Sequence, residues 1–133
     1  MAIWLVRAGR SGEFENKFLS EKKIYLTWDD QNIDLSQFED RQSLFEYLNE
    51  YYEDEKKNTL RNWVGQIYPF VHKMKTDDWV VLPSKFKSVI HIGRITGEYH
   101  YNKNASNPYF HYREVEWFAK DIPRTNFDQD LLY

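Results

Sequence analysis

The sequence predicts an α+β fold, a small and strongly curved β-sheet or barrel of five to six strands with helices inserted after the second strand. Short β-prone runs bounded by turn residues occur near the N-terminus and again in the second half of the chain. Between them, two segments repeat apolar residues at the spacing of an amphipathic helix. The 133 residues, 41% of them hydrophobic, suffice for one core, so we expect residues 1–133 to form a single domain.

The first two expected strands lie at the N-terminus. Residues 2–7 form an apolar, β-prone run, and Gly9 and Gly12 follow it as turn residues. Residues 13–20 fit either a short helix or an irregular segment. Residues 23–28 predict the second strand, which is closed by two consecutive aspartates.

Two helices are expected next. Residues 40–52 and a segment from residue 58 or 59 to residue 73 both place apolar side chains three and four residues apart. Pro69 lies inside the second pattern and lacks an amide hydrogen, so we expect that helix to bend or restart there.

The remaining chain has the character of strands. Residues 79–83, 88–97, 98–101 and 112–118 predict four short strands, and residues 102–108 form a polar loop between the last two.

Composition excludes several classes of protein. Cysteine is absent, which excludes disulfides, thiolate nucleophiles and cysteine-based zinc sites, and favours a cytoplasmic location. The N-terminus lacks the pattern of a signal peptide, and no apolar run approaches the roughly 20 residues that a membrane span requires. Aromatic residues make up 18% of the chain, more than a small core needs, so some rings are expected to line a surface or a pocket.

Charge is distributed unevenly along the chain. Residues 29–55 contain ten acidic residues and one base, Arg41, while the rest of the chain carries 17 bases and 11 acids. This segregation permits one face that accepts phosphate and another that repels it, although a solvated acidic helix alone would also produce it.

Catalytic motifs are missing. The sequence has no Gly-x-Ser-x-Gly turn, no phosphate-binding glycine loop and no Glu-x-Lys within an apolar strand. His100 and His111 would suit a metal if they faced each other across adjacent strands, but no carboxylate completes the set. We therefore expect no catalytic residue, no metal and no cofactor in this chain.

Aromatic and polar residues cluster where elements begin or end. Trp28 closes the second strand and precedes Asp29, while Asn62 and Trp63 fall in the expected first turn of a helix. A base removed from a duplex is held by stacking on aromatic faces and by hydrogen bonds to its edge. Trp28 and Trp63 are therefore candidate pocket walls, and the alternative that each is a core residue stays open.

An ordered set of segments resembles a known group of domains. The set comprises residues 3–7, 61–63, 72–84, 90–95 and 115–117. It is similar to the EVE and YTH reader domains of the PUA superfamily, which implies a PUA-like curved β-barrel. The chain departs from the family pattern in the turn before the third strand, where Asp77 replaces the usual glycine, and at Gly65, which is displaced from the glycine that precedes the helix.

The chain also resembles the N-terminal segment of Mrr-like, modification-dependent restriction endonucleases. Residues 58–63, 79–85 and 122–132 carry this likeness. It implies a nuclease domain in cis, downstream of this chain, and residues 131–133 are expected to begin a segment of a longer protein.

The resemblance implies recognition of a modified base, a methylated cytosine or adenine, in double-stranded DNA. Asn62 and Trp63 fall near the pocket residues that the family has at its helix start, and Ser84 falls near its polar residue at the strand end; Trp28 and Asp29 come from the residue pattern alone. The expected base-binding residues are Trp28, Asp29, Asn62, Trp63 and Ser84, and the expected phosphate-contacting residues are Arg61, Lys85 and Lys87.

Two alternatives remain. Single-stranded RNA is also recognised by stacking on aromatic rings, so an RNA-modification reader of the same fold fits the pattern. A protein-interaction or dimerisation module would use the acidic segment 29–55 with Tyr47, Tyr51 and Tyr52.

Overall fold

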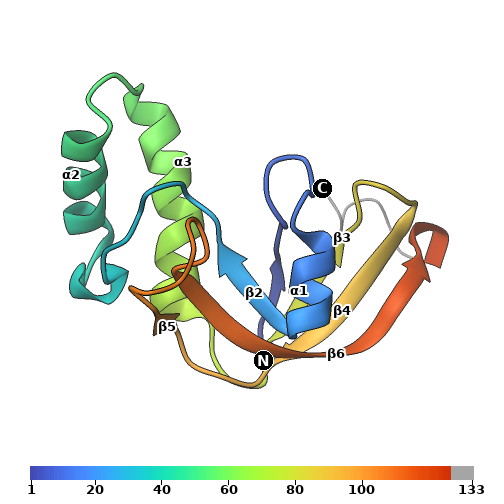
Figure 1. Ribbon diagram of the computed structural model, residues 1–133. Helices are drawn as coiled ribbons and strands as arrows, with labels where there is room; N and C mark the ends of the chain where they lie inside the picture. The colour runs from blue at the N-terminus through green and yellow to red at the C-terminus, as the bar shows by residue number, and fades with distance from the viewer. Residues whose placement is uncertain (127–133) are drawn as a thin grey trace.

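The computed structural model describes residues 1–126, whose six strands form one curled, half-barrel sheet (Figure 1). The strands are β1 (Ile3–Leu5), β2 (Lys23–Leu26), β3 (Trp79–Pro83), β4 (Val89–Ile95), β5 (His100–Tyr101) and β6 (His111–Pro123). Their order across the sheet is β1-β3-β4-β6-β2, with β5 paired to β6. The β1–β3 pair is parallel and the other pairs are antiparallel. Residues 131–133 lie outside the described residues.

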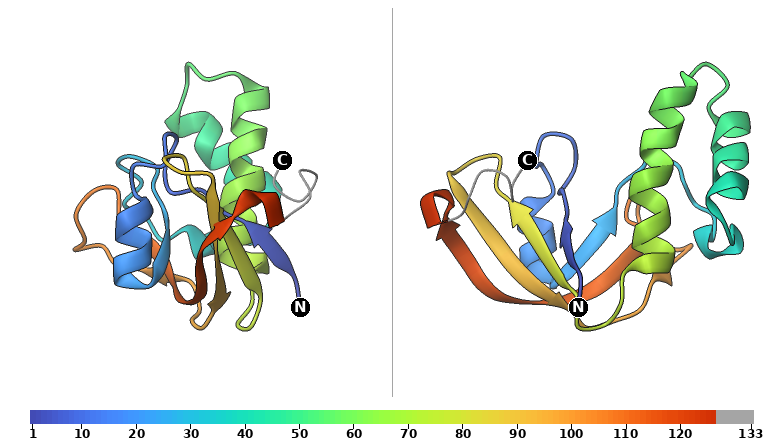
Figure 2. Two further views of the ribbon diagram at one scale, coloured as in Figure 1. Left: turned by 90° about the vertical axis from the view of Figure 1, so that its right-hand side faces the viewer. Right: turned by 180° about the vertical axis from the view of Figure 1, so that it is seen from behind.

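The helices confirm the predicted α+β class and the insertion after the second strand. The first helix, α1 (Glu15–Glu21), joins β1 to β2 and lies within the curve of the sheet. Between β2 and β3 come η1 (Leu35–Gln37), α2 (Arg41–Tyr51), α3 (Lys57–Tyr68) and η2 (Pro69–Lys73). The view from behind shows α2 and α3 side by side at one end of the molecule (Figure 2). Among the described residues, no helix has both the length and the apolar character that a membrane crossing requires.

Local chemistry accounts for the helix boundaries. The Asp40 carboxylate accepts a hydrogen bond from the Ser43 amide at 2.7 Å and so caps the start of α2. Pro69 has no amide hydrogen to continue α3, and the chain changes there to the wider π-helical turn η2. The predicted bend or restart at Pro69 is confirmed.

The core lies between the concave side of the sheet and the helices. Phe18 of α1, Leu48 of α2 and Leu60 of α3 belong to the same buried cluster as Val80 and Ile95 of the sheet. These five side chains are completely or almost completely buried, so this contact supplies the main hydrophobic stabilisation of the fold.

The turn before β3 keeps a glycine-like conformation although it contains an aspartate. Asp77 has φ +78°, in the left-handed region that side chains other than glycine seldom adopt. Its carboxylate accepts a hydrogen bond from the Arg94 guanidinium at 2.6 Å, and its amide donates to the Ile95 carbonyl at 2.8 Å. These two contacts hold the turn in the conformation that a glycine would adopt without strain.

A buried arginine joins β6 to the end of the inserted helices. Arg113 is 4% exposed, and its guanidinium donates to the carbonyls of Phe70 at 2.7 Å, Val71 at 3.1 Å and Gly97 at 3.3 Å. Phe70 and Val71 belong to η2, where carbonyl groups near a helix end carry partial negative charge. Burial lowers the pKa of Arg113, and these carbonyls solvate its charge.

We expect Arg113→Met to lower the free energy of unfolding by about 2–5 kcal/mol, because it leaves the Phe70 and Val71 carbonyls buried without a donor. Arg113→Lys should lose less, since it keeps the charge and one donor. Urea denaturation of the three proteins measures the difference. Equal stability of Arg113→Met and the parent chain would contradict the role assigned to this side chain.

A second buried polar connection begins two residues earlier in β6. His111 is 1% exposed; its Nε2 lies 2.6 Å from the Gln31 carbonyl, and its Nδ1 lies 2.7 Å from the Tyr99 hydroxyl. The Gln31 side chain in turn accepts from the Tyr47 hydroxyl and donates to the Tyr52 hydroxyl, both at 2.9 Å. This chain of bonds connects the sheet to α2 through one buried glutamine.

Burial lowers the pKa of His111, so the folded protein binds a proton at this ring less readily than the unfolded chain does. The free energy of unfolding should therefore fall as pH drops below about 6.5, by up to about 1.4 kcal/mol per pH unit until the folded-state pKa is reached. Urea denaturation at several pH values between neutral and mildly acidic measures this slope. In His111→Gln the slope should be shallower, and an unchanged slope would assign the pH dependence to another group.

Candidate functional site

The structure brings Trp28 and Trp63 together, although 35 positions separate them in the sequence. Trp28 lies two residues beyond β2, and Trp63 projects from α3. Their ring centroids are 6.3 Å apart, and Tyr52 adds a third ring whose centroid lies 5.1 Å from that of Trp63. All three side chains are half-buried and pack against the core, so they are walls of the core as well as surface residues.

The geometry of these rings differs from a base sandwich. Two parallel rings that hold a base between them lie about 7 Å apart, which is twice a van der Waals contact. The planes of Trp28 and Trp63 meet at 73°, so the edge of one ring meets the face of the other. A base would stack on the outer face of one ring or would have to turn one ring away from its neighbour.

Asp29 lies close to this aromatic group. Its side chain is exposed, and its charge, with that of Asp30, adds to the effect of burial in raising the pKa of Tyr52. The carboxylate therefore acts on the same ring that contacts Trp63, and it is free to accept hydrogen bonds from a ligand.

The helix register separates the other expected residues. The expected position of residues 61–63 in the first turn is wrong, because α3 begins at Lys57 and Trp63 is its seventh residue. Their amides thus fall beyond the first four of the helix, which alone lack a partner within it. Arg61 and Trp63 project about 160° apart on the helix, and the Arg61 guanidinium lies 5.4 Å from the Phe45 ring centroid. Asn62 is exposed on the side away from the core.

Ser84, Lys85 and Lys87 lie in the turn between β3 and β4. Ser84 is 3% exposed, and its hydroxyl oxygen accepts from the amides of Phe86 at 3.1 Å and Lys87 at 3.2 Å. Both acceptor positions of that hydroxyl are thus filled, which leaves only its proton for a ligand. The two lysines are exposed, and the Lys87 ammonium lies 3.6 Å from the Asp121 carboxylate.

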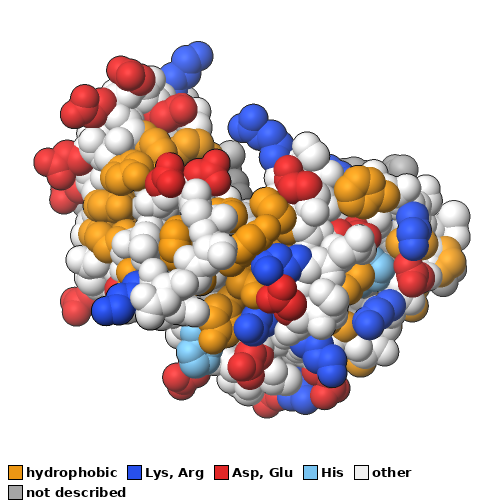
Figure 3. Space-filling view, in the orientation of Figure 1, with side chains coloured by type: hydrophobic (Ala, Val, Ile, Leu, Met, Phe, Trp, Pro, Cys, Tyr) orange, Lys and Arg blue, Asp and Glu red, His pale blue; other side chains and the backbone are white. Residues whose placement is uncertain are grey.

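The site residues therefore form two groups. In Figure 1 the loop between β1 and α1 lies between the β3–β4 turn and α3. The space-filling view shows the surface hollowed between the α2–α3 lobe and the rest of the molecule (Figure 3). Trp63 belongs to the lobe and Lys85 to the opposite part, so the sequence-predicted residues lie in two groups and do not form one compact pocket.

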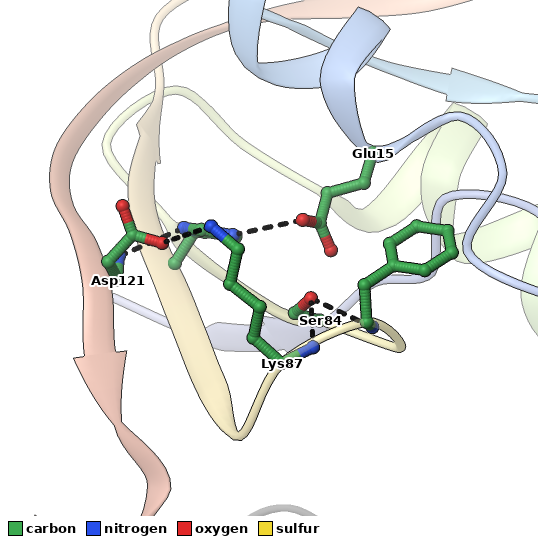
Figure 4. A network of polar contacts seen from close by, with 6 residues as sticks. Glu15, Ser84, Lys87 and Asp121 are labelled. Carbon is green, nitrogen blue, oxygen red and sulfur yellow. Dashed lines mark hydrogen bonds and ion pairs between the residues drawn. The ribbon is translucent and has the colours of Figure 1, made fainter.

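A buried polar network lies beneath the β3–β4 turn (Figure 4). Glu15, the first residue of α1, places one carboxylate oxygen 3.6 Å from Nε2 of His91 in β4, and Nδ1 of His91 accepts from the Asp121 amide at 3.1 Å. The second Glu15 oxygen and His91 Nε2 have no hydrogen-bond partner. Buried polar atoms usually have a hydrogen-bond partner, so these two atoms remain able to bond a further polar group.

The sequence did not identify three of these polar or aromatic residues as part of a site. Tyr52 was assigned only to the apolar pattern of α2 and to an interaction face. Gln31 and Glu15 have no signal in the sequence, because a polar residue in a loop or at a helix start is normally solvated.

Metal-binding geometry is absent from the described part of the chain. Residues 1–126 contain no group of three or more His, Cys, Asp or Glu side chains able to hold an ion. His100 and His111 are not paired across the strands, because the register sets His100 opposite Tyr112 and Tyr101 opposite His111.

A hollow with basic character lies beside the N-terminus. Arg41, Lys73 and Lys75 contribute to its lining together with Trp4 and Asp78. Asp78 is already bonded by the Ala2 amide, the Trp4 indole and the Lys75 amide, at 2.9–3.0 Å. Lys73 and Lys75 belong to the bases outside the acidic segment, while Arg41 is the one base within it.

Comparison with protein-family models gives a match over nearly the whole chain. A family model described as a domain of unknown function, DUF8426, matches residues 4–130. Neither the curated proteins nor the solved structures provide a match. Because the family model covers nearly the whole chain, this protein belongs to the DUF8426 family.

Proposed function

We propose that this chain is a modified-DNA-binding domain that accepts a flipped methylated cytosine or adenine against the rings of Trp28 and Trp63. The observation that carries the proposal is the half-buried contact of Trp28, Trp63 and Tyr52 beside an exposed carboxylate. Stacking on such rings is worth about 1–3 kcal/mol per base and does not depend on the identity of the base.

Hydrogen-bonding groups near the rings fit the edges of the two bases. A carboxylate such as Asp29 accepts from the amino group of cytosine, and an amide such as Asn62 pairs with the N6 and N7 positions of adenine. Ser84 belongs to the other group of residues, in the β3–β4 turn, so its hydroxyl proton would not meet a base that stacks on these rings. A methyl group on the base would add about 0.8 kcal/mol if it were fully buried.

The charge pattern supports a particular approach of the DNA. Trp28 is followed by the acidic segment 29–55, which repels phosphate. Lys85 and Lys87 are exposed in the β3–β4 turn, outside the acidic segment. The backbone would lie on the lysine side and the base would extend toward the aromatic rings. Arg61 lies toward Phe45 and would contact phosphate only at the edge of this path.

The conformation of Asp77 supports the resemblance to EVE and YTH domains, because the residue that replaces their glycine keeps a left-handed backbone. On this resemblance we extend the proposal to the whole protein. The domain would direct an Mrr-like restriction endonuclease to modified DNA in the cytoplasm, with a nuclease domain in cis. This chain itself would supply no catalytic residue.

We expect Trp28→Ala and Trp63→Ala each to weaken the binding of modified duplex by about 5- to 150-fold, because each removes a stacking face. The preference for modified over unmodified duplex should fall by up to about fourfold, because the methyl group loses its buried contact. Fluorescence anisotropy with duplexes carrying 5-methylcytosine, 5-hydroxymethylcytosine, glucosylated cytosine or N6-methyladenine measures the preference. Phe118→Ala is the control, since Phe118 is an exposed ring on β6. An unchanged preference in both tryptophan variants, with circular dichroism intact, would refute the pocket. Tighter binding of modified RNA than of modified DNA would favour the RNA reader.

Lys85→Ala and Lys87→Ala should weaken the binding of modified and unmodified duplex equally, because phosphate contacts carry no sequence information. Each lost contact should reduce the slope of log affinity against log salt by about 0.9. Salt titrations of the two variants measure this slope. A change in the preference for the modified base would instead place the lysine at the base edge.

A further inference from the structure

The face of α2 that carries Tyr47 and Tyr51 presents a continuous aromatic row, made of Phe38, Tyr47, Tyr51 and Tyr52. Phe38 and Tyr47 stack with centroids 4.8 Å apart at 30°, Tyr51 follows at 5.9 Å from Tyr47, and Tyr52 lies 4.8 Å from Tyr51. Tyr51 is 48% exposed and the other three rings are half-buried. The row therefore offers ring surface to solvent along one side of the helix.

Hydrogen bonds beneath the row hold it rigid. The buried Gln31 side chain bonds the hydroxyls of both Tyr47 and Tyr52 at 2.9 Å. Rings that are already fixed lose little conformational entropy when a partner binds, so the row is preorganised as a contact surface.

Acidic side chains surround the row. All ten acids of residues 29–55 are exposed, and none of them forms an ion pair with a base among the described residues. They are Asp29, Asp30, Asp34, Glu39, Asp40, Glu46, Glu50, Glu53, Asp54 and Glu55. The space-filling view shows hydrophobic side chains gathered on the α2–α3 lobe with acidic groups at their margin (Figure 3).

We propose that the aromatic row binds a segment of another protein that is rich in arginine and lysine. A guanidinium stacks on a tyrosine face and pairs with a nearby carboxylate, so a basic segment uses both features of this surface. The chain already contains a similar contact, because the Arg41 guanidinium lies 4.8 Å from the Tyr68 ring centroid.

The charge of the segment argues against other occupants. Nucleic acid carries dense negative charge and is repelled by the unpaired carboxylates. A second copy bound through the same face would bring two segments of net charge −9 together, which like-charge repulsion opposes. This inference does not rest on the proposed DNA binding, because its main contacts are Phe38, Tyr47 and Tyr51 and its ligand has the opposite charge; Tyr52 and Asp29 belong to both surfaces.

A fluorescein-labelled octapeptide of alternating arginine and leucine tests the proposal by fluorescence anisotropy, with an octapeptide of alternating glutamate and leucine as its counterpart. We expect the arginine peptide to bind and the glutamate peptide not to bind. The affinity should fall steeply from 0.1 M to 1 M salt, over which the screening length falls from about 10 Å to about 3 Å.

Two variants locate the binding site. We expect Tyr51→Ser to weaken binding about twofold to fivefold and the double variant Glu46→Gln/Glu50→Gln to weaken it about twofold to thirtyfold. Phe118→Ser and Glu98→Gln/Glu114→Gln are the matched controls; Phe118 is 47% exposed, and both glutamates are exposed outside the acidic segment. The controls should bind the arginine peptide as the parent chain does.

Three results would overturn the proposal: no binding of the arginine peptide, equal binding of both peptides, or equal losses in the variants and their controls. Sedimentation of the parent chain and Tyr51→Ser tests the remaining occupant, since a dimer abolished by this substitution would assign the row to a second copy. Binding of modified duplex by Tyr51→Ser is measured in parallel. Because Trp28 and Trp63 are unchanged there, failure of the DNA proposal and failure of this one remain distinguishable.

Discussion

The position of the whole helical insertion depends on the buried guanidinium of Arg113. It bonds only to main-chain carbonyls, two of them in η2, and so fixes the end of the α3–η2 helix against β6. Arg113 also lies directly opposite Ile24 in the register between β6 and β2. Trp28 follows β2 and Trp63 belongs to α3, so both tryptophans are placed relative to the same residue.

The first part of β6 connects the sheet to the rest of the fold through three alternate side chains that point inward. His111, Arg113 and Val115 are buried, while the residues between them are half-buried or exposed. His111 holds the Gln31 loop, Arg113 holds η2, and Val115 packs into the core. A buried polar group is costly unless it is bonded, so each of these two polar side chains specifies one arrangement of its partner. Gln31 extends the connection to the hydroxyls of Tyr47 and Tyr52. The aromatic row is therefore held in place by the sheet as well as by α2.

Sequence patterns predict the elements of this fold better than its polar contacts. Apolar spacing and Pro69 locate the helices and the change at η2, because these signals are local. The start of α3 was misplaced because its N-cap residue, Lys56, makes no side-chain bond and gives no signal. Arg113 lies in a strand with alternating burial, and its partners are main-chain carbonyl groups. Because every residue has a carbonyl group, no partner residue type in the sequence indicates that Arg113 is buried. The proximity of Trp28 and Trp63 follows from their places at element ends, whereas their 73° angle follows from side-chain packing that the sequence does not encode locally.

The acidic segment has a physical consequence for both proposed surfaces. It follows Trp28 directly and continues along α2, so a polyanion that approaches the tryptophans experiences repulsion on one side of the hollow only. The basic side, with Lys85 and Lys87, then sets the orientation of the backbone. A basic protein segment experiences the opposite field and is directed to the aromatic row. Because the field that repels one proposed ligand attracts the other, a single segregation of charge would favour a different ligand on each side. Tyr52 and Asp29 belong to both proposed surfaces and would therefore couple the two binding events.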